Sequence, residues 1–158
     1  MFKNIFKFLL LCCGLFLLTG CSTGMVKASP ERSALVKEFN NPPEGKAGLY
    51  FYKHTAGVFR GPGEALRVAY LDDQAIAKLK QHYFIYMDVE PGEHVISVES
   101  EFSPNKLNIL FEKGKNYFVR QYLKIGIFVN GSNVVLMDEE KAKKALKDDD
   151  YILVEFRK

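Results

Sequence analysis

The chain has 158 residues, which suits one domain with a single core, and 47% of them are hydrophobic. Its 22 lysines and arginines against 19 acidic residues give a formal net charge of +3. Lys3 and Lys7 stand in an N-terminal segment without acids, and no dense basic block follows, so the composition argues against a nucleic-acid-binding protein.

Residues 1–20 have the layout of a secretory signal peptide. A short basic stretch, residues 1–7, precedes the uncharged apolar run 8–18. A run of this length suits the hydrophobic part of a signal peptide, which has about 7–15 residues. As a helix it would span roughly 16 Å, against about 30 Å of bilayer hydrocarbon, which disfavours a transmembrane helix.

Leu18, Thr19, Gly20 and Cys21 close the apolar run. They resemble the lipobox of bacterial lipoproteins. The resemblance implies that the leader is removed before Cys21, that diacylglycerol is attached to its sulfur, and that its amine receives an acyl chain such as palmitate. The other interpretation is an ordinary signal peptide with a chance cysteine. Because residue 22 is Ser rather than Asp, the resemblance implies the outer membrane, facing the periplasm, with the inner membrane and the cell surface as alternatives.

The remaining cysteines, Cys12 and Cys13, both lie in the leader. The mature domain would then contain no thiol beyond residue 21 and no disulfide, so its stability must come from packing. We expect no metal, and no cofactor other than the covalent diacylglycerol and acyl chain on Cys21.

Residues 21–44 predict a lipidated N-terminus followed by a polar tether. As a coil, about 20 residues would reach about 25 Å from the bilayer. Part of this tether is predicted to be helical, because Ser29 can cap a helix that begins at Pro30, with Leu35 and Phe39 on one face.

Residues 45–158 predict one mainly β domain, an immunoglobulin/prealbumin-like β-sandwich with one C-terminal helix. Short apolar strands alternate with turns. The predicted strands are residues 46–53, 66–71, 75–79, 83–89, 94–101, 107–112, 117–124, 127–129 and 134–137. Two hairpins are expected, one around a type II turn at Pro91 and Gly92 and one around residues 130–132. A helix over 138–147, capped by Asp138, precedes a strand or extended tail at 151–156.

Three motifs carry a family resemblance: residues 48–53, the strand at 83–89 leading to Pro91, Gly92 and His94, and residues 114–120. They resemble a family of small bacterial lipoproteins that carry a conserved domain of unknown function. The Pro-Gly-x-His segment is also similar to the hairpin of PEGA-type surface modules. These resemblances imply a β fold and an envelope location, and they imply no activity.

The histidines and the glycine-rich loop are the candidates for chemistry. In a regular hairpin His82 and His94 would lie roughly 23 Å apart, too far to share a metal ion. We expect His94 to fix its turn by a hydrogen bond. The loop that holds His54, Arg60 and Glu64 is the one segment where an active site is plausible, but it lacks the nucleophile, metal-protease and phosphate-loop motifs. Asp148 to Asp150 are expected in a solvated turn.

An aromatic face is the candidate binding surface. With Leu49 and Phe51, Ile85 and Met87, and Tyr117, Val119 and Leu123 directed to the core, the opposite face presents Tyr50, Tyr52, Phe84, Tyr86, Phe118, Arg120 and Tyr122. Such a face could bind a glycan or a protein partner. The alternative is that the C-terminal helix or a second sheet covers it.

The sequence therefore predicts a membrane-anchored envelope lipoprotein with a non-enzymatic, structural or partner-binding domain. The alternative is a glycan- or small-ligand-binding module that uses the aromatic face. The expected partners are the membrane, through the lipid anchor, and an envelope protein or glycan, with no nucleic acid.

Overall fold

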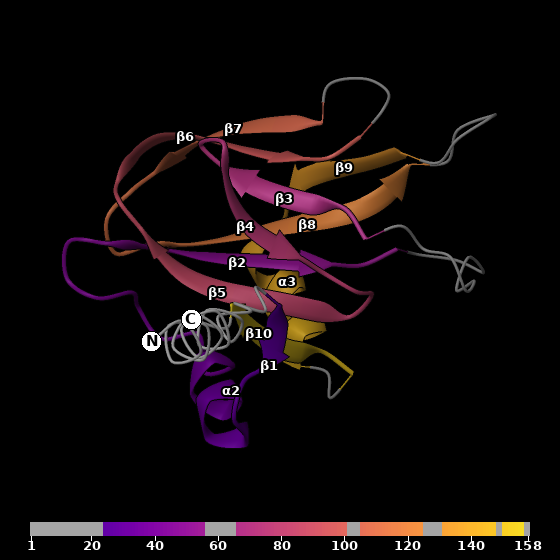
Figure 1. The fold of residues 1–158 in the computed structure, drawn as a ribbon. Coiled ribbons are helices and arrows are strands. Elements are labelled where there is room, and N and C mark those ends of the chain that lie inside the picture. Colours follow the sequence, from indigo (N-terminus) through magenta and orange to yellow (C-terminus); the bar gives the residue numbers. More distant parts are fainter. Residues whose placement is uncertain (1–23, 56–65, 101–104, 125–130, 148–149, 157–158) are drawn as a thin grey trace, which may run out of the picture.

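The computed structural model describes residues 24–55, 66–100, 105–124, 131–147 and 150–156, which form two β-sheets and two helices (Figure 1). In chain order the elements are β1 (Met25–Lys27), α2 (Pro30–Val36), β2 (Ala47–Lys53), β3 (Val68–Leu71), β4 (Gln74–Lys78), β5 (Tyr83–Val89), β6 (Gly92–Val98), β7 (Lys106–Phe111), β8 (Asn116–Lys124), β9 (Gly131–Leu136), α3 (Glu139–Lys147) and β10 (Ile152–Phe156). A six-stranded sheet has the order β1-β10-β5-β2-β8-β9, and a four-stranded sheet has the order β4-β3-β6-β7. The prediction of a mainly β sandwich with a C-terminal helix is confirmed.

The main core lies between the two sheets. Leu49 and Phe51 of β2 are fully buried there, and Ile85 of β5 and Val119 of β8 lie beside them on the paired strands. The four-stranded sheet closes this core with side chains such as Phe111. The period-two pattern that directed these residues inward is therefore confirmed.

The six-stranded sheet mixes parallel and antiparallel pairs. β2 runs parallel to β8, and β5 runs parallel to β10, while β2 and β5 are antiparallel. These parallel pairs depart from the all-antiparallel sheets of an immunoglobulin domain. The sandwich is predicted correctly, and the immunoglobulin connectivity does not describe it.

The predicted hairpin around Pro91 and Gly92 is wrong. β5 pairs with β2 and β10, whereas β6 pairs with β3 and β7 in the other sheet. The turn therefore carries the chain from one sheet to the other. Gly92 has a φ of 139°, a backbone region that glycine adopts without steric cost. The similarity to a PEGA-type hairpin does not extend to strand pairing.

A second predicted turn is a strand. Gly131 and Ser132 pair with Lys124 and Leu123 as the first residues of β9, so β8 and β9 are antiparallel neighbours. The predicted strand at 127–129 lies outside the described residues. β9 also contacts β6 and β7, which closes the sandwich along this side.

The segment predicted as a tether is part of the fold from residue 25. β1 pairs with β10, and Ser29 caps α2 by accepting a hydrogen bond from the backbone N–H of Arg32. Val36 and Phe39 are buried, whereas Leu35 is 53% exposed. The predicted helix is therefore correct, but its buried face is not the one expected. The free tether shortens because this segment docks on the sheet.

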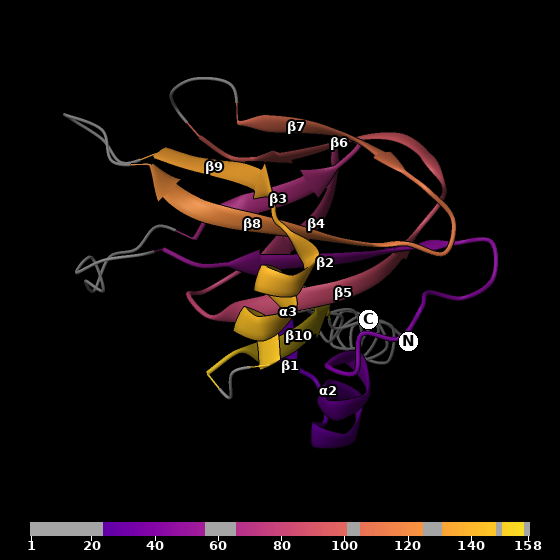
Figure 2. The same cartoon turned by 180° about the vertical axis from the view of Figure 1, so that it is seen from behind.

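The helices cover the outer face of the six-stranded sheet. Figure 2 shows α3 lying across this face, with α2 below it. Asp138 caps α3 as predicted, because its carboxylate accepts a hydrogen bond from the Lys141 N–H at 3.0 Å. In the described part of the chain, neither helix is long and apolar enough to cross a membrane.

Candidate functional site

The aromatic face is a second core rather than an open surface. Tyr50 and Tyr52 are 2% exposed and Phe84 is fully buried. The covering side chains come from α3 and from the segment at the end of α2, and they are Ala142, Leu146, Val36 and Phe39. The prediction that these aromatic residues offer a ligand surface is therefore wrong, and the alternative of a covering helix holds.

Tyr50 shows how this layer is fixed. Its ring stacks on Phe118 at 4.8 Å and lies 5.2 Å from the ring of Phe39. Its hydroxyl donates a hydrogen bond of 3.1 Å to the Val36 carbonyl at the end of α2. Burial raises the pKa of Tyr50 to about 12, so the phenol stays neutral and keeps donating. This tyrosine joins the N-terminal segment to the sheet.

The remaining members of the predicted face do not form one patch. Tyr86 donates a hydrogen bond to the Asp88 carboxylate at 2.7 Å, and burial raises its pKa. Arg120 and Tyr122 contact each other at 5.7 Å, guanidinium to ring centroid. The register places Tyr86 opposite Tyr50 on the neighbouring strand. Tyr122 lies two strands from Tyr86 and four residues farther along, so Tyr86 and Tyr122 are roughly 16 Å apart.

His94 plays the predicted structural role. Its Nε2 lies 2.9 Å from the Glu90 carbonyl oxygen, and its Nδ1 lies 2.5 Å from the Asp72 carboxylate. The same carboxylate accepts a hydrogen bond from the Val95 N–H. That bond, followed by the one from His94, lowers the pKa of Asp72. His94 therefore ties the crossing between the sheets to the turn at Asp72.

The structure brings together two histidines that sequence reasoning did not pair. The rings of His54 and His82 are stacked with centroids 5.6 Å apart. His54 Nδ1 is 2.7 Å from the Tyr151 hydroxyl, and Asp150 lies 3.9 Å from His82. No group of three or more potential metal ligands occurs among the described residues. Arg60, Glu64 and most of the loop beside His54 lie outside those residues, as do Asp148 and Asp149.

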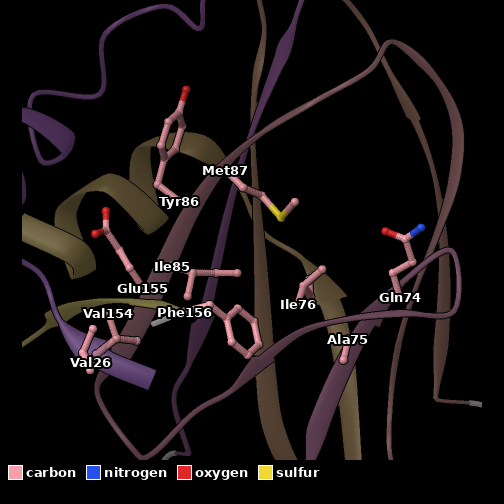
Figure 3. A pocket seen from close by; sticks show the side chains of 10 residues that line it. All are labelled: Val26, Gln74, Ala75, Ile76, Ile85, Tyr86, Met87, Val154, Glu155 and Phe156. Atoms are coloured by element: carbon pink, nitrogen blue, oxygen red, sulfur yellow. The ribbon is translucent and has the colours of Figure 1, made fainter. Parts of the chain in front are cut away.

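A pocket of about 880 Å³ lies at the side of the sandwich where β4 approaches β5, β10 and β1. Figure 3 shows the side chains of Ile76, Ile85, Met87 and Phe156 directed toward one space. Ile76 and Ile85 are buried at its floor, and Phe156 is 43% exposed at its mouth. The complete lining is Val26, Gln74, Ala75, Ile76, Ile85, Tyr86, Met87, Val154, Glu155 and Phe156.

The polar groups of this pocket lie at its margin. Glu155 points away from the apolar space in Figure 3 and pairs with Arg32 Nε at 3.3 Å. The guanidinium of Arg32 also lies 5.9 Å from the Tyr86 ring centroid. A pocket with a mostly apolar wall and few polar groups is the usual form of a small-ligand site. Sequence reasoning missed it because its lining comes from four separate segments.

Comparison with known proteins places the chain in a family. Residues 43–132 match the family described as protein of unknown function, DUF2846. A curated protein of Haemophilus influenzae, described as uncharacterized, is 44% identical over 131 residues, which cover 82% of this chain and 74% of that protein. No solved structure matches the chain. The predicted resemblance to a family with a domain of unknown function is confirmed: the chain belongs to the DUF2846 family.

Proposed function

We propose that this protein is a lipid-anchored component of the cell envelope, attached to the outer membrane through Cys21 and facing the periplasm. Its β-sandwich has a structural or partner-binding role and performs no catalysis. The sequence at residues 18–21 supports the anchor, and Ser22 supports outer-membrane sorting.

The observation that carries the proposal is the short distance between Cys21 and the fold. β1 begins at Met25, so four residue steps join the lipidated cysteine to the six-stranded sheet. A fully extended chain covers at most about 3.6 Å per residue, so these steps can span no more than about 14 Å. This is about half of the reach expected for a free tether. The lipid anchor would therefore hold the β1 edge of the sandwich at the bilayer surface.

The chemistry of the pocket supports binding rather than catalysis. Its floor is aliphatic, and its ionised group, Glu155, is paired with Arg32 at the margin. An acid–base site needs a titratable group within hydrogen-bond reach of its substrate. The pocket walls instead offer apolar contact area, which suits a hydrophobic ligand. The pocket, rather than the aromatic face, is therefore the better candidate for a small-ligand site.

The anchor is tested by replacing the cysteine. Cys21→Ala should abolish labelling by a clickable palmitate analogue and release the protein from the membrane fraction. Cys13→Ala is the matched control, because it removes a leader cysteine and should leave labelling and fractionation unchanged. Labelling that persists in Cys21→Ala, or equal loss in both variants, would contradict the assignment of Cys21.

The partner is tested in intact cells. Crosslinking of the wild-type protein, followed by mass spectrometry, should recover a defined envelope component. The same experiment on Cys21→Ala should lose that component, because the anchor confines the domain to the membrane surface. Equal recovery from both proteins would show that membrane attachment does not direct partner binding.

A further inference from the structure

The pocket is lined by the first strand of the fold, which follows the proposed anchor residue closely in the sequence. Val26 of β1 lines the pocket, and the neighbouring Met25 pairs with Phe156 at the pocket mouth. Cys21 precedes Met25 by four residues, and four residues of chain can span at most about 14 Å between their Cα atoms. The first strand of the described structure therefore borders the pocket and begins four residues after Cys21.

The shape and chemistry of the cavity indicate an acyl chain. An enclosed apolar cavity of about 150 Å³ accommodates benzene, and this partly open pocket, at about 880 Å³, is about six times larger, which is enough for a long acyl chain. Its floor consists of Ile76, Ile85 and Val154, and all three are at least nine-tenths buried. Methylene groups are the ligand chemistry that such a wall recognises.

We propose that this pocket holds one of the fatty acyl chains attached to the protein's own Cys21. This inference rests on the lipidation proposed above and adds a place for one of its chains. The chain would enter past Phe156 and lie between β4 and the β5–β10 pair. The remaining acyl chains would stay in the bilayer, and two chains are sufficient for stable anchoring.

The tether and the charge of the pocket margin both favour the protein's own chain over a free lipid. First, a ligand tethered by a few residues has an effective concentration in the millimolar range, so it outcompetes the same ligand in solution. Second, the lining contains no cation, and Arg32 beside the pocket is paired with Glu155. A fatty acid or phospholipid brings an anionic head that this margin does not neutralise, whereas the acyl groups on a lipidated cysteine end in neutral ester and amide bonds.

The experiment supplies growing cells with a palmitate analogue that carries a diazirine near its methyl end. The lipidated protein is purified after irradiation in the membrane, and its crosslinked peptides are mapped by mass spectrometry. We expect crosslinks within one chain, from the acyl group on Cys21 to peptides that contain Ile76, Met87 or Phe156. Mixing isotopically labelled and unlabelled protein distinguishes these from crosslinks between copies.

A variant that fills the pocket tests the contact directly. Ala75 is exposed at the pocket margin, so Ala75→Trp adds an indole without disturbing the buried floor. The yield of pocket crosslinks should fall at least about tenfold, because each displaced methylene group contributes a factor of about four to binding. Ala34→Trp adds the same group on the exposed side of α2 and should leave the yield unchanged. Gln74→Trp, also exposed at the mouth, provides a second filling variant.

The outcomes separate the two proposals. Intact mass without a lipid on Cys21 would overturn the anchor and, with it, this inference. A lipidated protein whose acyl groups crosslink only to phospholipid or to another copy would overturn the pocket assignment and leave the anchor intact. Equal crosslink yields in Ala75→Trp, Gln74→Trp and Ala34→Trp would also overturn it.

Discussion

Substitution of Phe39 tests whether the segment after α2 is a spacer or part of the folded domain. The Phe39 side chain is 6% exposed and lies 5.2 Å from Tyr50 and 5.9 Å from Phe118, ring centroid to centroid. Truncating a buried phenylalanine to alanine costs about 3–5 kcal/mol. The backbone of residue 39 has a left-handed φ of 57°, which is unfavourable for phenylalanine and alanine alike. The substitution therefore relieves no backbone strain that could offset the lost packing. We therefore expect Phe39→Ala to lower the free energy of unfolding by about 3 kcal/mol.

The assay is thermal and urea unfolding of a soluble form that begins at residue 22, followed by circular dichroism. For a domain of this size, 3 kcal/mol corresponds to a fall in Tm of about 10 °C. Leu35→Ala is the matched control in the same segment, because Leu35 is 53% exposed and should change stability by less than about 0.5 kcal/mol. If both variants fall within that narrow range of the wild type, the docked segment contributes nothing and the reasoning fails.

Two further predictions concern contacts within the sandwich. Gly48→Ala would place a Cβ 2.1 Å from the Asn116 side-chain oxygen, so the Asn116 side chain would have to move. Asn116 would then lose its hydrogen bonds to the carbonyls of Phe39 and Asn40, which should lower the free energy of unfolding by about 1–2 kcal/mol. In an Asn116→Ala background the same change should cost clearly less, and full additivity in urea unfolding would contradict the contact. Asp72→Asn should destabilise the domain near neutral pH, because the Val95 N–H and His94 lower the pKa of Asp72 below its ordinary value of 3.8. This stabilisation is present above pH 3.8 and is lost as the pH falls through the lower pKa of the folded state. The urea midpoints of the wild type and Asp72→Asn should therefore converge in acid. A constant difference between the two midpoints at every pH would refute the linkage.

Strand positions could be predicted from the sequence because they depend on local alternation and turn residues. β2 and β5 match their predicted ranges closely, and the cap at Asp138 can be predicted from one side chain. Pairing could not be predicted in the same way. Pro91 and Gly92 specify a change of direction, and a change of direction fits a hairpin and a crossing between sheets equally well.

A signal against the hairpin was present in β5. Both of its faces are apolar or aromatic, with Ile85 and Met87 on one and Phe84 and Tyr86 on the other. A strand of this kind belongs in the middle of a sheet with both faces covered. The structure gives β5 such a place, between β2 and β10, and leaves no edge for β6.

The pocket and the docked N-terminal segment both depend on long-range pairing. Val26, Ile76, Met87 and Phe156 come from four strands whose neighbourhood follows only from the complete sheet order. The polar composition of residues 22–41 indicates a tether, because Val36 and Phe39 are too few to predict a packing face. Their burial is visible once the aromatic face that receives them is known.

The pairing of β1 with β10 also sets an order of events during biogenesis. Met25 meets Phe156, so the first strand of the domain finds its partner only when nearly the whole chain has been made. Closing so long a loop is slow compared with local hairpin formation. If the chain is exported and lipidated as we propose, β1 would still be unpaired when the modifying enzymes act on Cys21. Once β10 forms, β1 pairs with it and completes this edge of the sheet, so the proposed anchoring would precede the completion of folding.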